Sequence, residues 1–198
     1  MNEFLTLPAG PVAEAGLAIV YETESAPVAE HSIRTFLFAR LIAAKDGSLS
    51  DAAYDEGLLF AACVLHDLGL GSRAAGEARF EVEGADLAAE FLTGHGLAAN
   101  DIDRVWEAIA LHSSHGIAVR RGLISSLTYR GVFMDAGSPD DTLSAGQREQ
   151  VLAAYPRPVG DRSVRDAIVE HAARSAAAAP PHSISADLLR QARSGVGG

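Results

Sequence analysis

The sequence predicts an all-α, single-domain helical bundle, and three observations lead to that prediction. Apolar residues recur at helical spacing in successive segments, and Gly, Pro or Asp residues separate these segments. No segment shows the sustained alternation of apolar and polar residues that is typical of half-buried strands. The chain has 198 residues, of which 48% are hydrophobic, so it can bury one full core, and no repeat or linker divides it.

The expected helices follow one another along the whole chain. Residues 1–11 contain Pro8, Gly10 and Pro11 and are expected to form an extended arm. A central helix is expected to begin near residue 51, with Ser50 or Asp51 as its N-cap. Helical segments are predicted over residues 12–21, 29–44, 51–67, 80–92, 100–112, 124–136, 144–154, 163–179 and 184–192. We expect an N-terminal arm with a short helix (1–28), a core (29–137), C-terminal helices packed on that core (138–193) and a disordered tail (194–198).

The composition excludes several classes of function. The net charge is −10, so a broad nucleic-acid-binding surface is not expected. No stretch reaches the roughly 18 apolar residues of a membrane span, and the N-terminus lacks the basic, apolar start of a signal peptide. Cys63 is the only cysteine and lies in an apolar run, so it is expected to be a buried thiol. We therefore expect a soluble, cytoplasmic protein whose partner is a small molecule, with homo-oligomer formation left open.

The helix predicted over residues 51–67 ends in a polar pair whose side chains can bind a metal. An apolar run from Leu58 to Leu65 leads directly into His66 and Asp67. Burying an imidazole beside a carboxylate is costly unless both groups are paired, hydrogen-bonded or bound to a cation. A divalent metal would compensate both, since both groups are good metal ligands. The simpler alternative is that Asp67 only makes a hydrogen bond at a helix end.

Polar residues also stand at the ends of other apolar helices. His31 lies near the start of the helix predicted over 29–44, and His112 and Asp135 lie at the ends of two later helices. Helical bundles build metal sites from side chains that project from facing helices. The pattern therefore favours one site that gathers His31, His66, Asp67, His112 and Asp135.

With these residues the chain resembles the HD-domain superfamily of metal-dependent phosphohydrolases and hydratases. The signature is a histidine, a distant His-Asp pair and a later aspartate, here His31, His66-Asp67 and Asp135, and it covers roughly residues 29–137. The resemblance implies that these four residues hold a divalent metal. Within the superfamily the chain looks most like the branch that contains cyanamide hydratase, through the segments His31-Ser32-x-Arg34, Phe80–Ala85, Glu107–Ser113 and Gly131–Asp135.

One departure from the superfamily pattern bears on the number of metals. Relatives with two metals place a histidine before a glycine on the helix predicted over 80–92, and this chain has Glu83 before Gly84. We therefore expect one divalent ion (Fe, Mn, Zn or Ni), with a second metal less favoured. The site residues implied are metal ligands His31, His66, Asp67 and Asp135, catalytic residues Asp67, Glu83 and His112, and substrate-binding residues Arg34, Ser113 and His115. In this scheme Asp67 or Glu83 takes a proton from a metal-activated water and His112 donates one.

Three functions compete at this point. The leading one is a metal-dependent enzyme that uses activated water on a small molecule, by hydrating a nitrile-like C–N bond or hydrolysing a small polar bond. The alternative is a nucleotide or phosphate-ester phosphohydrolase, which would need cationic partners such as Arg34, Arg73, Arg120 and Arg121. The third is a non-catalytic helical binding module, which would have no need for all four ligands.

Overall fold

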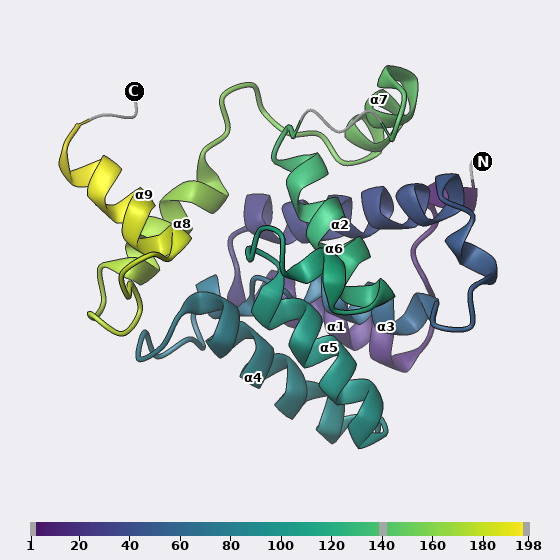
Figure 1. Ribbon diagram of the computed structural model, residues 1–198, viewed down its shortest axis with the longest axis horizontal. Coiled ribbons are helices and arrows are strands. Elements are labelled where there is room, and N and C mark those ends of the chain that lie inside the picture. The colour runs from purple at the N-terminus through teal and green to yellow at the C-terminus, as the bar shows by residue number, and fades with distance from the viewer. Residues whose placement is uncertain (1–2, 139–141, 196–198) are drawn as a thin grey trace.

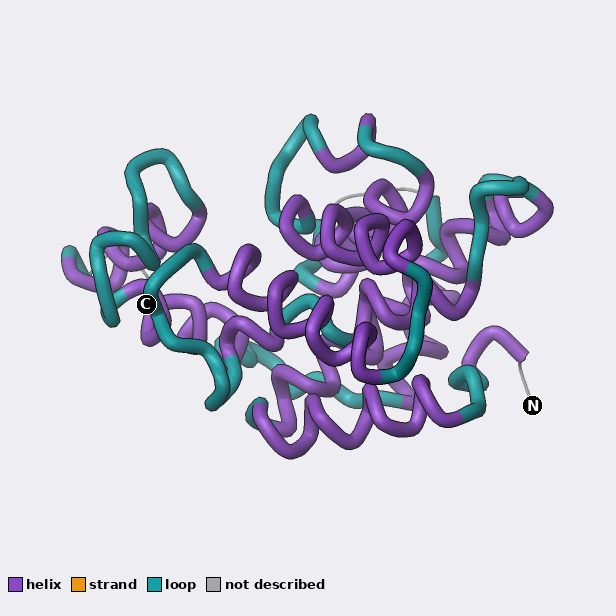
Figure 2. The backbone as a smooth tube through the Cα atoms, turned by 90° about the horizontal axis from the view of Figure 1, so that it is seen from below, coloured by secondary structure: helices purple, strands orange, loops and turns teal. Residues whose placement is uncertain are grey.

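The computed structural model describes residues 3–138 and 142–195, and all regular structure in that part of the chain is helical (Figure 2). The prediction of an all-α fold is therefore confirmed. The α-helices are α1 (Pro11–Thr23), α2 (Ala26–Lys45), α3 (Glu56–Val64), α4 (Phe80–Gly94), α5 (Ala99–Leu111), α6 (Leu123–Asp135), α7 (Ala145–Ala154), α8 (Ser163–Ala172) and α9 (Ile184–Arg193). Short 3₁₀ turns are η1 (Glu3–Leu5), η2 (Ser48–Ser50), η3 (Leu68–Leu70) and η4 (Ala118–Arg120).

Helix α2 is the centre of the bundle, with α6 and α3 packed along it (Figure 1). Its apolar residues, among them Phe36 and Leu37, are fully buried. Gly131 of α6 lies directly against the α2 backbone, where an added Cβ would overlap the carbonyl of Thr35. This close approach brings the C-terminal end of α6, with Asp135, beside the first turns of α2, with His31.

Helix α3 is shorter at its start than the sequence predicted. Its N-cap is Asp55, whose side chain accepts a hydrogen bond from the Leu58 backbone N–H at 2.9 Å, and not Ser50 or Asp51. Residues 51–53 instead form a turn, in which the Asp51 carboxylate accepts from the Ala53 N–H. A local side-chain hydrogen bond thus competes successfully with helix formation at Asp51.

The segment after α3 is pinned against the start of α4. A Cβ on Gly69 would overlap the Phe80 carbonyl, and one on Gly84 would lie 3.1 Å from the His66 carbonyl. Glycine at both positions lets the two backbones touch. His66 and Asp67 are therefore fixed between the end of α3 and the turn η3.

The C-terminal helices α8 and α9 lie at one end of the molecule, away from the N-terminus (Figure 1). Helix α8 ends at Ala172, not near residue 179 as predicted, because the chain turns there to bond the loop before α4. Arg174 Nη1 donates to the Ala74 carbonyl at 2.7 Å, and Ser175 Oγ donates to the Gly76 carbonyl at 2.6 Å. Most of the tail expected to be disordered, residues 196–198, lies outside the described residues.

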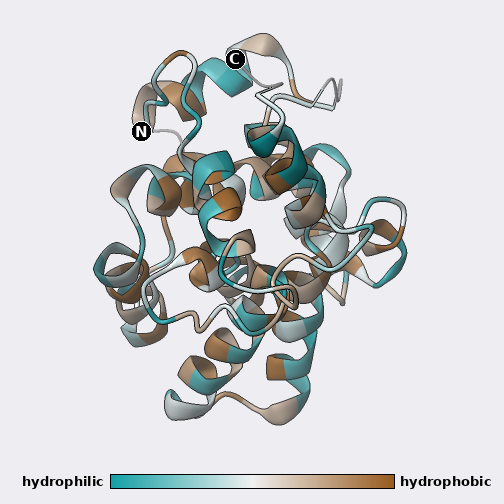
Figure 3. Cartoon of the chain, turned by 90° about the vertical axis from the view of Figure 1, so that its left-hand side faces the viewer, coloured by the Kyte–Doolittle hydropathy of each residue, from teal (hydrophilic) through white to brown (hydrophobic). Residues whose placement is uncertain are grey.

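The helices are amphipathic in the way the sequence pattern predicts. Hydrophobic and hydrophilic segments alternate along the helical ribbons (Figure 3). In α5, Val105 and Ile109 are fully buried while Asp103 and Trp106 face outward. Within the described chain, none of the helices combines the length and the apolar character that crossing a membrane requires.

Candidate metal centre and adjoining cavity

Three buried side chains bring metal-binding atoms together. His31, His66 and Asp67 each offer one donor atom, and these atoms lie within 4.8 Å of one another. Asp67 Oδ2 is 3.3 Å from His66 Nε2 and 3.8 Å from His31 Nε2. Imidazole nitrogen and carboxylate oxygen at such spacing could hold one divalent cation.

The hydrogen bonds behind the histidines fix which nitrogen faces the site. His66 Nδ1 lies 2.7 Å from the Cys63 carbonyl, and His31 Nδ1 lies 2.6 Å from Asp135 Oδ2. Both oxygens are acceptors, so both Nδ1 atoms carry the proton. The Nε2 atoms of both rings therefore face Asp67, the orientation found in metal-ligating histidines held by an outer hydrogen bond.

A further observation indicates that the donor atoms suit a divalent metal. His66 Nε2 and Asp67 Oδ2 are buried and have no hydrogen-bond partner within the described part of the chain. Burial opposes the charge on Asp67, yet His66 and the neighbouring histidines hold the pKa of that carboxyl well below its usual range. A buried carboxylate that stays ionised beside an unsatisfied imidazole nitrogen is the arrangement that a cation completes.

Asp135 lies behind His31, outside the group of three donors. Its Oδ1 accepts from Arg34 Nε at 2.7 Å, and its Oδ2 contacts both His31 Nδ1 and, at 3.0 Å, Arg34 Nη2. Burial would raise the Asp135 pKa, but His31 and Arg34 lower it to about 2. Both carboxylate oxygens are thus occupied, and the structure brings Asp135 to the site as the residue that orients His31 and neutralises Arg34.

His112 completes the polar floor of the site. Its Nδ1 donates to the Ile109 carbonyl at 2.7 Å, and its Nε2 is 4.0 Å from Asp67 Oδ1. Burial and the nearby His66 lower the pKa of His112 to about 4. The ring is therefore neutral at neutral pH, and its Nε2 atom, which faces the site, carries a lone pair. In this neutral form the ring can accept a proton at Nε2, whereas the sequence-based scheme has it donate one.

The structure places Glu83, which the sequence-based scheme predicted to be catalytic, outside this cluster. Its carboxylate accepts backbone N–H groups from Gly76, Glu77 and Ala78, and it does not line the cavity beside the donor atoms. These hydrogen bonds outweigh burial and lower the Glu83 pKa. Glu83 organises the loop before α4, on which the C-terminal end of α8 rests.

The carboxylate that does approach the site is Glu81, which sequence reasoning missed. It is fully buried, accepts from Arg79 Nη2 at 2.6 Å and bonds the Ser113 hydroxyl. Burial opposes its charge, but Arg79 and His112 lower the Glu81 pKa. The available signal was helical spacing, because Glu81 stands four and seven residues before the buried Ala85 and Ala88.

The predicted substrate-binding residues separate into two groups. Arg34 and Ser113 line the cavity beside the donor atoms. His115 does not line it, and its Nδ1 instead bonds the Tyr129 hydroxyl. The reason is the turn after α5, which carries His115 to an exposed position next to Gly116.

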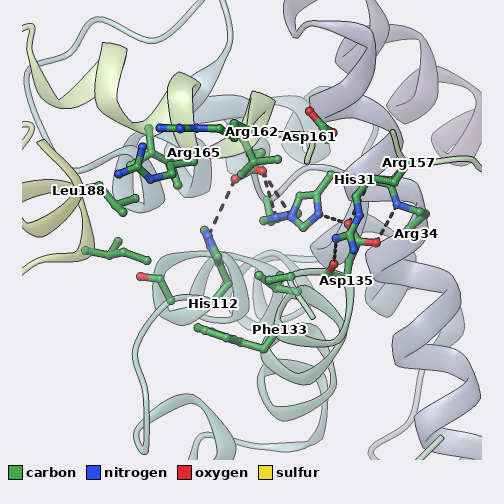
Figure 4. Close-up of a pocket in the computed structure, with 18 residues that line it drawn as sticks. His31, Arg34, His112, Phe133, Asp135, Arg157, Asp161, Arg162, Arg165 and Leu188 are labelled. Carbon is green, nitrogen blue, oxygen red and sulfur yellow. Dashed lines mark hydrogen bonds and ion pairs between the residues drawn. The ribbon is translucent and has the colours of Figure 1, made fainter. Parts of the chain in front are cut away.

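The donor atoms open onto a cavity of about 330 Å³ (Figure 4). One wall comes from α6 and the other from α8, α9 and the segment before them. The lining side chains beyond the donor residues are mainly apolar or arginine: Val132, Phe133, Val164, Ile168, Ile184 and Leu188 with Arg34, Arg157, Arg162 and Arg165. The last three arginines belong to the C-terminal part of the chain and were not among the cations predicted to reach the site.

The loop arginines predicted for that role lie elsewhere. Arg73 pairs with Glu22 at 3.4 Å, and Arg121 pairs with Glu107 at 2.7 Å. Arg120 donates to the Gly116 carbonyl at 2.6 Å. None of the three lines the cavity.

This geometry and the comparison with known families agree. The HD domain family matches residues 28–178, so the chain belongs to the HD-domain family. HD domains are in general metal-dependent hydrolases that bind divalent metals. No curated protein matches the chain. The matched segment extends past the predicted core to α8, which supplies the far wall of the cavity.

Proposed function

We propose that this protein is a metal-dependent hydrolase whose substrate is a small phosphate ester. The observation that carries the proposal is the cavity itself, which joins the buried donor atoms of His31, His66 and Asp67 to several arginine side chains. Guanidinium groups recognise phosphate through paired, charge-assisted hydrogen bonds. In a chain of net charge −10, a cavity with cations in its walls favours an anionic substrate by local contacts.

One divalent ion is the cofactor in this proposal, held by His31, His66 and Asp67. When bound, such an ion lowers the pKa of water toward neutrality and neutralises charge that develops on the substrate. Asp135 holds the His31 ring in the tautomer that presents Nε2, through the 2.6 Å contact with Nδ1. Arg34 is engaged with Asp135, so it stabilises the donor set.

Hydrolysis of the ester exchanges one P–O bond for another. The oxygen of the attacking water forms the new bond to phosphorus, and the ester P–O bond breaks with its electron pair going to the leaving oxygen, which takes a proton from solvent and departs as an alcohol. His112 Nε2, neutral and 4.0 Å from Asp67 Oδ1, accepts the proton from the attacking water. Ser113, held by Glu81, lies in the cavity wall where its hydroxyl can contact the substrate.

A second candidate is the hydration of a nitrile-like C–N bond. Arg34, three residues after His31, is paired with Asp135. Its guanidinium is therefore not free to bind a phosphate, which favours a neutral substrate. Beside the donor atoms the cavity also offers the apolar side chains of Val132 and Phe133, which suit a small neutral substrate. The resemblance to the cyanamide hydratase branch points the same way.

The two candidates are separated by one parallel screen on metal-loaded protein. Phosphate release from 4-nitrophenyl phosphate and from nucleoside monophosphates is compared with urea formation from cyanamide. His66→Ala and Asp67→Ala serve as controls that remove donor atoms. Phosphate release that both variants abolish supports the proposal, whereas urea formation without phosphate release replaces it with hydration.

A further inference from the structure

Among the described residues, the positively charged side chain of Arg165 in the cavity wall has no carboxylate paired with it. Arg165 lies on α8 and lines the cavity together with the donor residues. Its recorded hydrogen bond goes to the Gln191 side-chain amide at 3.4 Å, which is a long contact. Among the described residues, no carboxylate lies within ion-pair distance of Arg165. A guanidinium in a cavity wall therefore has no anionic partner.

The other arginines of the cavity are engaged. Arg34 is 1% exposed and pairs with Asp135 through two nitrogens. Arg157 donates to the backbone carbonyl of Asp135, and Arg162 lies 3.9 Å from an Asp166 carboxylate oxygen. Arg165 therefore differs from Arg34 and Arg162 in having no carboxylate within ion-pair distance, and from Arg157 in that its hydrogen bond is long.

The surroundings of Arg165 are apolar and come from the C-terminal helices. Val164 and Ile168 flank it on α8, and Ile184 and Leu188 of α9 face the same cavity. Figure 4 shows Arg165 and Leu188 on one side of His112, with Arg34, Asp135 and Arg157 on the other. A charge-assisted hydrogen bond is stronger where neighbouring groups are apolar, so binding of an anionic ligand group is favoured at Arg165.

We propose that Arg165 binds a second anionic group of the substrate, a carboxylate joined by a short apolar segment to the phosphate ester that is hydrolysed. This inference rests on the proposed phosphate-ester hydrolysis. The apolar side chains of α8 and α9 hold the connecting segment, and the guanidinium pairs with the carboxylate at its far end. The 330 Å³ cavity is at the small end of ligand pockets, which suits a substrate of this size.

The test uses two probes of nearly equal shape. 4-Carboxyphenyl phosphate carries the remote carboxylate, and 4-methylphenyl phosphate has a neutral methyl group in its place. The ratio of their kcat/KM values is measured for the metal-loaded wild-type protein, for Arg165→Met and for Arg165→Lys. Arg190→Met is the matched control, because it removes the same charge from the outer face of α9, where Arg190 pairs with Asp187.

Wild-type protein is expected to favour the carboxylate probe by about tenfold or more, the effect of one charge-assisted pair. Arg165→Met should reduce the ratio of the two kcat/KM values to about one. Arg165→Lys should keep part of the preference, and Arg190→Met should keep all of it. An equal preference in wild type and Arg165→Met, or no preference in wild type, overturns the inference.

A binding measurement separates this inference from the proposed reaction. Calorimetry compares the non-hydrolysable 4-carboxyphenylphosphonate and 4-methylphenylphosphonate on the same variants. If neither phosphate ester is hydrolysed but the carboxylate analogue binds tighter only when Arg165 is present, the reaction fails and the Arg165 site stands. Equal binding of the two analogues to wild type overturns the Arg165 site.

Discussion

His31 Nδ1 lies 2.6 Å from Asp135 Oδ2, a contact that joins two residues 104 positions apart in the chain. The carboxylate can only accept, so His31 must donate from Nδ1 and present Nε2 to the donor group. The same carboxylate pairs with Arg34, which lies one helical turn after His31 on α2. One aspartate at the end of α6 therefore sets both the tautomer of a metal-binding histidine and the charge balance around it.

Asp135→Asn is expected to weaken metal binding without abolishing it. The amide can rotate to present its NH₂ or its oxygen to His31, so the preferred tautomer is lost while His31, His66 and Asp67 remain. Loss of such an outer partner costs about 10–100-fold in metal affinity. Competition with a chelator of known affinity measures this change. A loss as complete as that of Asp67→Ala would show instead that Asp135 binds the metal directly.

The Arg34–Asp135 pair predicts a strong energetic coupling. Asp135→Asn leaves the buried Arg34 charge without its partner, which typically costs about 3–5 kcal/mol of unfolding free energy. Arg34→Met removes that charge, so the double variant should lose less stability than the sum of the two single variants. Denaturant unfolding of metal-free protein gives all four values. Additive losses would mean that the pair does not interact in solution.

Glu83→Gln is expected to lower stability and to leave kcat within about threefold. The Glu83 carboxylate accepts three backbone N–H groups of residues 76–78, and the amide can accept at one oxygen only. Loss of charge-assisted hydrogen bonds of this kind costs about 1.5–3 kcal/mol each at most. Thermal unfolding and turnover are measured on the same samples. A 10²-fold or larger fall in kcat with unchanged stability would return Glu83 to the catalytic residues.

His112 predicts a pH dependence of stability in metal-free protein. Its pKa is about 4 in the folded chain and about 6.5 in an unfolded one. The unfolded state therefore binds the extra proton first, and unfolding free energy falls as pH drops from about 6.5 to about 4, by up to about 3 kcal/mol. His112→Asn should make this fall shallower in urea titrations at several pH values. Parallel curves for wild type and variant would contradict the lowered pKa.

The fold and the donor residues could be predicted from sequence because both follow from local pattern. Helical spacing of apolar residues defines the helices, and the apolar run before His66 shows that Asp67 must be buried and compensated. His31 stands in the first turns of α2, a helix whose residues are mostly buried. The helices and the His66-Asp67 pair follow from the helical period and the cost of burying charge, whereas His31 is implied as a ligand by the resemblance to the HD-domain superfamily.

The remaining features depend on contacts between distant segments. Glu81 and Glu83 are two residues apart, so a helix directs them to different faces, and only the packed fold shows that Glu81 is the one near His112. The arginines of the cavity come from α8 and the segment before it, which the sequence marks only as C-terminal helix. Their placement depends on how Arg174 and Ser175 anchor α8 to residues 74–76.

The central claim is that His31, His66 and Asp67 hold one divalent ion. Elemental analysis of protein purified without added metal tests it most directly, with His66→Ala and Asp67→Ala purified in parallel. We expect close to one divalent ion per wild-type chain and almost none in either variant, with a lower melting temperature as metal is lost. Full metal content in both variants, or none in wild-type protein even after incubation with Fe, Mn, Zn and Ni, would contradict the account.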